Sequence, residues 1–125
     1  MHELSICYSL LNQVEAIAQT HQARRVASIT LQIGVLSGVE PELLRQAFSI
    51  AQAGTVAEQA TLICQTLGVK VRCQQCQAES EVSINRLLCA HCGAWQTQVI
   101  SGDEMLLASV ELITDNSAQP ENKAD

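Results

Sequence analysis

The sequence has very few aromatic residues and no long apolar run. Aromatic side chains make up 2% of its 125 residues, as single copies of Trp95, Tyr8 and Phe48, so its core must be aliphatic. No run approaches the roughly 18 consecutive apolar residues of a membrane-spanning helix, so we expect no membrane span. Residues 1–22 lack the basic start and apolar segment of a secretory signal, so we predict a cytoplasmic protein.

Basic residues are also scarce. The sequence has 7 basic and 13 acidic side chains, for a formal net charge of -6, and its longest basic cluster is Arg24–Arg25. A phosphate backbone is repelled by such a surface, so nucleic-acid binding is disfavoured. An acidic balance suits a cationic ligand, although only as a weak field effect.

The first part of the chain predicts a helix followed by a strand. Apolar residues recur every three or four positions from Leu4 to Ala18, which predicts an amphipathic helix ending near His21–Gln22. Apolar and polar residues alternate between Val26 and Leu36, which predicts a half-buried strand. Its expected buried face consists of Ile29, Leu31, Ile33 and Val35, and its other face of Ser28, Thr30 and Gln32.

A second helix and two more strands follow. Pro41 suits the first helical position, which makes Glu40 the expected N-cap, and Gly54 is a stop signal. Strands are expected around Ala60–Leu67 and over Met105–Ile113, where apolar residues alternate again.

These elements predict an α+β domain from residues 1–67 plus 105–114, interrupted by a cysteine-bearing module at 68–104. Two helices would pack on a three-stranded sheet whose last strand follows the inserted module. Residues 115–125 are polar and contain Pro120, so we expect a disordered tail.

Two Cys-x-x-Cys pairs, twelve residues apart, predict a metal site. The four cysteines are Cys73, Cys76, Cys89 and Cys92. Two such knuckles give tetrahedral sulfur coordination, which suits Zn(II), and 78–88 would be a short hairpin joining them. Redox pairs or disulfides are the alternative, and reduced cytoplasmic thiols favour zinc over both. Four protein ligands leave no position for water, so a zinc enzyme is disfavoured.

The chain start offers a second set of metal ligands. The His2 imidazole and the Met1 α-amino group, together with backbone nitrogens, can form the square-planar nitrogen-rich set that Ni(II) favours. Glu3 opens the first helix, where a carboxylate is stabilised by the helix dipole, and it could orient His2. Taken alone, an N-terminal histidine is more often a polar terminal residue than a ligand.

Together these features resemble the HypA/HybF family of hydrogenase maturation factors. The resemblance runs from Met1 to about Ile113, through the Met1–Ser5 start, the segment Ser37–Glu42, Gly54–Thr55 and the paired Cys-x-x-Cys. It implies two helices on a mixed three-stranded sheet, with a four-cysteine zinc-ribbon domain inserted before the last strand.

The resemblance also implies a non-enzymatic nickel metallochaperone. Structural Zn(II) would stay bound while Ni(II) is cargo, held by His2 with the Met1 amine, with Glu3 in support and Glu40 as a further candidate ligand. The implied partners are a HypB-type GTPase and the [NiFe]-hydrogenase large-subunit precursor, with urease as another client in some relatives.

Some alternatives stay open at the level of sequence. A zinc-ribbon adaptor that scaffolds proteins explains the cysteines but not the chain start. For Glu40, the role of helix cap is at least as well supported as that of nickel ligand. A monomer and a dimer formed by segment exchange are both compatible with an inserted module.

Overall fold

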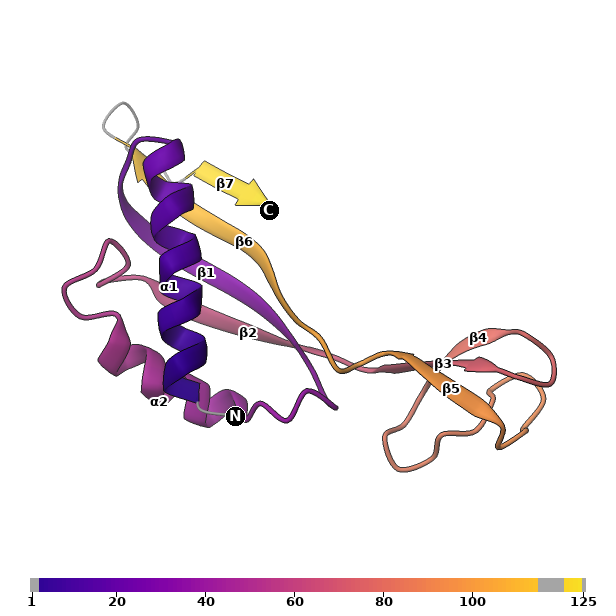
Figure 1. Ribbon diagram of the computed structural model, residues 1–125. Helices are drawn as coiled ribbons and strands as arrows, with labels where there is room; N and C mark the ends of the chain where they lie inside the picture. The colour runs from indigo at the N-terminus through magenta and orange to yellow at the C-terminus, as the bar shows by residue number, and fades with distance from the viewer. Residues whose placement is uncertain (1–2, 115–120, 125) are drawn as a thin grey trace. The chain divides into compact units, whose positions relative to one another are not determined.

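The computed structural model describes residues 3–114 and 121–124, which form two compact units (Figure 1). The first unit comprises Met1–Leu31, Glu40–Cys64 and Leu107–Asp125, and the second comprises Gln32–Val39 and Gln65–Leu106. Residues 32–39 join the second unit because their backbone is hydrogen-bonded to it. Leu36 N–H, for example, donates to Gly102 O at 2.7 Å.

Two helices belong to the first unit. Helix α1 (Glu3–Thr20) buries one aliphatic stripe: Ile6, Cys7, Leu10, Leu11, Val14 and Ala18. Its expected end is confirmed, since Gln22 takes a left-handed φ of 55° that stops the helix. Helix α2 (Pro41–Ala51) begins at the proline and buries Leu44, Phe48 and Ala51. Figure 1 shows α1 lying along the sheet, with α2 beside its N-terminal end.

The sheet of the first unit has the order β2-β1-β6-β7. Its strands are β1 (Ala23–Gly34), β2 (Thr61–Leu67), β6 (Met105–Thr114) and β7 (Glu121–Ala124). β1 and β2 are parallel, since Val35 N–H, just after β1, donates to Leu67 O at the end of β2. β6 is antiparallel to β1, since Gly34 N–H donates to Glu104 O, just before β6. The predicted arrangement of two helices and three mixed strands is therefore confirmed.

β7 is an addition to the predicted sheet. It pairs antiparallel with β6, from Ser109 opposite Ala124 to Leu112 opposite Glu121. Of the predicted disordered tail at 115–125, residues 115–120 and 125 lie outside the described residues, and 121–124 form a strand instead. The edge of β6 offers unpaired N–H and C=O groups with which even a polar extended segment can pair.

The burial of β1 follows its alternation only in part. Ile29, Leu31 and Ile33 are buried as predicted, whereas Val35 is 41% exposed. Val35 lies beyond the strand end, in the second unit, where the described residues include no helix to cover it. Ser28 was expected on the open face and is 7% exposed, because its hydroxyl donates a hydrogen bond to the Glu111 carboxylate.

The second unit is built on an antiparallel sheet of order β4-β3-β5. Its strands are β3 (Val69–Cys73), β4 (Glu79–Val82) and β5 (Thr97–Ser101). The hairpin expected within 78–88 is wrong in detail: β4 pairs with β3 across the first knuckle, and a tight turn at Ser83–Arg86 follows it. Cys73 ends β3 and Cys76 lies in the turn to β4, whereas Cys89 and Cys92 lie in the longer connection from β4 to β5.

Candidate metal centre

The two Cys-x-x-Cys turns have the same backbone hydrogen bonds. In the first, Gln77 N–H donates to Cys73 O at 3.0 Å. In the second, Gly93 N–H donates to Cys89 O at 2.9 Å. Each first cysteine also donates its N–H at 2.9 Å to the alanine five positions later, which closes the turn. The duplicated motif therefore folds into two duplicated knuckles.

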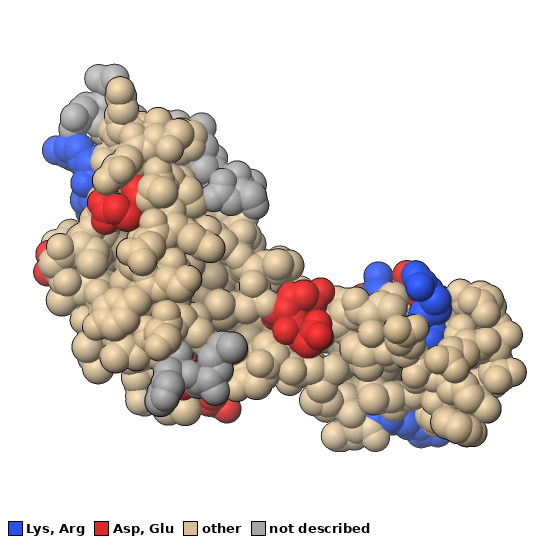
Figure 2. Space-filling model, viewed as in Figure 1, with Lys and Arg blue, Asp and Glu red and all other residues tan. Residues whose placement is uncertain are grey.

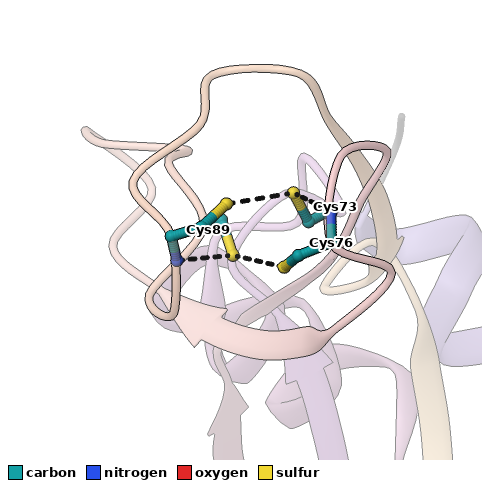
Figure 3. Close-up of side chains that lie close together, drawn as sticks. Cys73, Cys76 and Cys89 are labelled. Carbon is teal, nitrogen blue, oxygen red and sulfur yellow. Dashed lines mark hydrogen bonds between the residues drawn. The ribbon is translucent and has the colours of Figure 1, made fainter.

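The knuckles bring four sulfur atoms together, and Figure 3 shows those of Cys73, Cys76 and Cys89 facing one another. The Sγ atoms of Cys73 and Cys92 are 3.6 Å apart, as are those of Cys76 and Cys89. All four lie within 4.8 Å of one another. A tetrahedral zinc with Zn–S bonds of about 2.3 Å separates its sulfurs by about 3.8 Å, so the four thiols fit this ion.

Backbone N–H groups stabilise two of the sulfurs as thiolates. Cys92 N–H donates to Cys89 Sγ at 3.4 Å and His91 N–H at 3.3 Å, and these bonds lower the pKa of Cys89 to about 6. In the first knuckle, the equivalent N–H groups of Cys76 and Gln75 donate to Cys73 Sγ and lower the pKa of Cys73. Cys89 is therefore largely deprotonated at neutral pH before any metal binds, and the lowered pKa of Cys73 favours its thiolate in the same way.

The other two sulfurs retain their protons without metal. The Ala94 N–H lowers the pKa of Cys92, but the neighbouring Cys73 sulfur and burial raise it, and the net result is about 12. The pKa of Cys76 is also raised, because its own backbone donor is outweighed by the Cys89 sulfur and by burial. A divalent cation is the charge that would displace these protons, so metal binding here must release protons.

One structural residue of the site was missed by the sequence analysis. Gln77 has a left-handed φ of 67° at the place where the second knuckle has Gly93, with φ 78°. Aligning the two motifs, Cys73–Gln77 with Cys89–Gly93, would have revealed it. The His91 side chain is exposed, while its backbone N–H donates to Cys89 Sγ.

The predicted nickel ligands lie at the start of the chain. Met1 and His2 are outside the described residues. Glu3 is the first residue of α1 and is half-buried. Glu40 is the N-cap of α2 as expected, but its exposed side chain makes no capping hydrogen bond.

Glu3 and Glu40 lie at the N-terminal ends of two helices that contact each other. Cys7 Sγ in α1 donates to Leu44 O in α2 at 3.6 Å. Each glutamate lies four residues, or about 6 Å along a helix, before one member of this contact.

The remaining cysteines are structural. Cys7 is fully buried, and burial raises its pKa to about 11. Burial also raises the pKa of Cys64, which is half-buried on β2. Thiols that stay protonated at neutral pH are poor nucleophiles, so Cys7 and Cys64 act as small apolar side chains.

Comparison with known proteins decides the family. The family model described as "Hydrogenase/urease nickel incorporation, metallochaperone, hypA" matches residues 1–112. The chain belongs to the HypA family. It is therefore a nickel metallochaperone of hydrogenase maturation, a non-catalytic maturation factor that acts with the hydrogenase maturation machinery.

Relatives from this family match the chain over nearly their whole length. The hydrogenase maturation factor HypA of Nitrosospira multiformis is 51% identical over 114 residues, which is 91% of this chain and 99% of the relative. That of Aquifex aeolicus is 47% identical over 115 residues, 92% of this chain and 100% of the relative.

Solved HypA structures share the fold. The solution structure of the Ni metallochaperone HypA from Helicobacter pylori is 26% identical and has a TM-score of 0.69, covering 92% of this chain and 100% of that one. A second HypA solution structure gives a TM-score of 0.72 at the same identity, covering 92% of this chain and 98% of that one. Among the described residues, no helix combines the length and apolar character needed to cross a bilayer.

Proposed function

We propose that this HypA chain binds Ni(II) through the His2 imidazole, the Met1 amine and intervening backbone nitrogens. Glu3 supports this set, and Glu40 is a further ligand from α2. The observation in favour is the contact of Cys7 Sγ with Leu44 O at 3.6 Å, since Glu3 and Glu40 each lie four residues before one member of this contact. Glu40 is available because it makes no capping hydrogen bond.

The two metals would have different roles. Zn(II) bound by the four knuckle cysteines is structural, since a closed sulfur shell has no free position and exchanges poorly. Ni(II) is cargo, and an exposed chain end lets the ligands of a receiving protein attack before release is complete. Imidazole and amine must be deprotonated to bind, so falling pH should release nickel. The division into a nickel domain (1–67 plus 105–114) and a zinc domain (68–104) follows this assignment.

The proposed route of delivery is cytoplasmic. Reduced thiols are needed to hold zinc, and the cytoplasm keeps them reduced. The proposed partners are a HypB-type GTPase and the [NiFe]-hydrogenase large-subunit precursor, into which nickel is inserted. Figure 2 supports protein rather than nucleic-acid partners: on the visible face, the described basic side chains form small separate groups, not one extended patch.

Nickel titration of the zinc-loaded protein tests the proposed ligands. The protein needs its native N-terminus, and three variants are compared with it: His2→Ala, a two-residue N-terminal extension, and Glu40→Gln. The first two are expected to abolish the nickel site, because each removes one nitrogen ligand. Glu40→Gln is expected to weaken nickel binding without abolishing it. Unchanged affinity in both the His2 variant and the extended protein would refute the site.

A control separates ligand loss from misfolding. Glu42→Gln changes a neighbouring carboxylate that pairs with Arg45 at 3.5 Å on the exposed surface of α2. It should leave nickel affinity unchanged, and zinc content should remain one ion per chain in every variant. If Glu42→Gln weakens nickel binding as much as Glu40→Gln, Glu40 acts through general charge rather than as a ligand.

A further inference from the structure

The second unit contains a hollow of about 340 Å³ beside the second knuckle. It lies between the end of β4, the turn Ser83–Arg86 and the knuckle itself. Its lining includes the apolar side chains of Val82, Leu88 and Ala90 and the charged side chains of Glu81 and Arg86. We propose that this knuckle hollow binds an acidic peptide segment of a protein partner, whose carboxylate pairs with Arg86.

Arg86 differs from the other two basic residues of this unit in having no carboxylate of the described residues opposite it or paired with it. The Arg72 guanidinium donates to the Glu79 carboxylate at 2.5 Å, and Lys70 faces Glu81 directly across the β3–β4 pair. Arg86 is the third basic residue of the unit, and among the described residues no carboxylate pairs with it. An exposed guanidinium beside an apolar hollow favours a carboxylate, which it can bind with two parallel hydrogen bonds.

The hollow is held in shape by its surroundings. Arg86 N–H donates to Ser83 O at 3.0 Å, and Asn85 N–H donates to Ser83 Oγ at 3.2 Å, which fixes the turn. On the other side, Ala90 N–H donates at 3.2 Å to Ser80 Oγ of β4. Since one wall is the knuckle, zinc maintains the hollow as well as the fold. A preformed site binds without a large ordering cost.

The residues that line the hollow favour a short acidic peptide as its ligand. The apolar side chains of Val82, Leu88 and Ala90 can contact one aliphatic side chain of the peptide, next to the carboxylate that pairs with Arg86. β4 is an outer strand of its sheet, and extended peptides bind along such strands. A nucleic acid is a poorer match, because the lining offers a chain of phosphates one basic side chain, Arg86.

NMR titration of the full-length, zinc-loaded, ¹⁵N-labelled protein tests the proposal. The probes are the acetylated, amidated peptides Leu-Glu-Leu-Asp and Leu-Gln-Leu-Asn, which differ only in their charged groups. The acidic peptide is expected to shift the amide signals of Ser83–Arg86 and Ala90–Gly93. It should bind about tenfold more tightly than the neutral peptide, the effect of one hydrogen bond to a charged group.

Two arginine variants test whether the tighter binding of the acidic peptide depends on the hollow. Arg86→Gln should abolish the difference between the peptides, whereas the matched control Arg72→Gln should retain it, because Arg72 already pairs with Glu79. Equal binding of the two peptides, no shifts at either segment, or equal effects of both variants would overturn the proposal. Nickel affinity should be unchanged in both variants, so failure here is distinct from failure of the nickel site.

Discussion

The two knuckles allow a prediction in which the stability lost by a substitution in one knuckle is restored by a substitution in the other. Gln77 and Gly93 occupy the same left-handed position, with φ of 67° and 78°. A side chain in this conformation costs about 1–2 kcal/mol, and glycine loses about 0.5–1 kcal/mol more backbone freedom on folding. Gln77→Gly should therefore stabilise the unit by about 0.5–1 kcal/mol, and Gly93→Ala should destabilise it by a similar amount.

Neither substitution is expected to change stability through a steric clash or a strong hydrogen bond, so the backbone conformation decides both effects. A β-carbon added at Gly93 meets no atom within 4 Å, so no clash contributes. Gln77 loses one exposed hydrogen bond, from its side-chain amide to Gln74 O at 3.2 Å, and exposed bonds of this kind contribute little. The doubly substituted protein should return close to the parent value, since the two turns have the same geometry.

Zinc affinity is the appropriate measurement, because folding of this unit and metal binding are coupled. Competition with a chromophoric chelator at neutral pH should show Gly93→Ala binding zinc about fivefold more weakly, the equivalent of about 1 kcal/mol. Gln77→Gly should bind two- to fivefold more tightly by the same conversion. Weaker zinc binding by Gln77→Gly, or parent affinity in Gly93→Ala, would refute the reasoning.

Two further predictions concern the strand connections of the second unit. A β-carbon at Gly34 would lie 2.1 Å from Gly102 O, so Gly34→Ala should lower the free energy of unfolding by about 3 kcal/mol, and a loss below 1 kcal/mol in urea unfolding would argue against this close approach. The Gly102 N–H and the Ser101 hydroxyl donate to the Glu104 carboxylate and hold its pKa below the ordinary 4.5. A lowered folded pKa gives stability that is present above pH 4.5 and is lost as the pH falls through the folded value. Glu104→Gln should therefore flatten the acid side of the stability curve relative to the parent, and parallel curves would contradict this.

Local sequence patterns predicted the secondary structure and the cysteine site well. The three-to-four spacing of apolar residues from Leu4 to Ala18 defines a helix face whichever partner it packs on, and the structure confirms α1. Spacing also sufficed for the cysteines, because each Cys-x-x-Cys turn is held by its own local hydrogen bonds. The ligands at Met1 and His2 stay a prediction, since they lie outside the described residues.

Contacts between distant segments decided what the sequence alone did not predict. Ser28 is buried because Glu111, on another strand, accepts its hydrogen bond, and no local pattern encodes that pairing. Arg86 has no carboxylate partner among the described residues, whereas the pairing of β3 with β4 brings Arg72 to Glu79 and places Lys70 opposite Glu81. Side-chain periodicity is a property of consecutive residues, whereas burial and charge pairing depend on which strands become neighbours. The sequence by itself therefore determined the two helices, strands β1, β2 and β6, and the four-cysteine cluster, and the tertiary structure decided which polar groups remained free to bind.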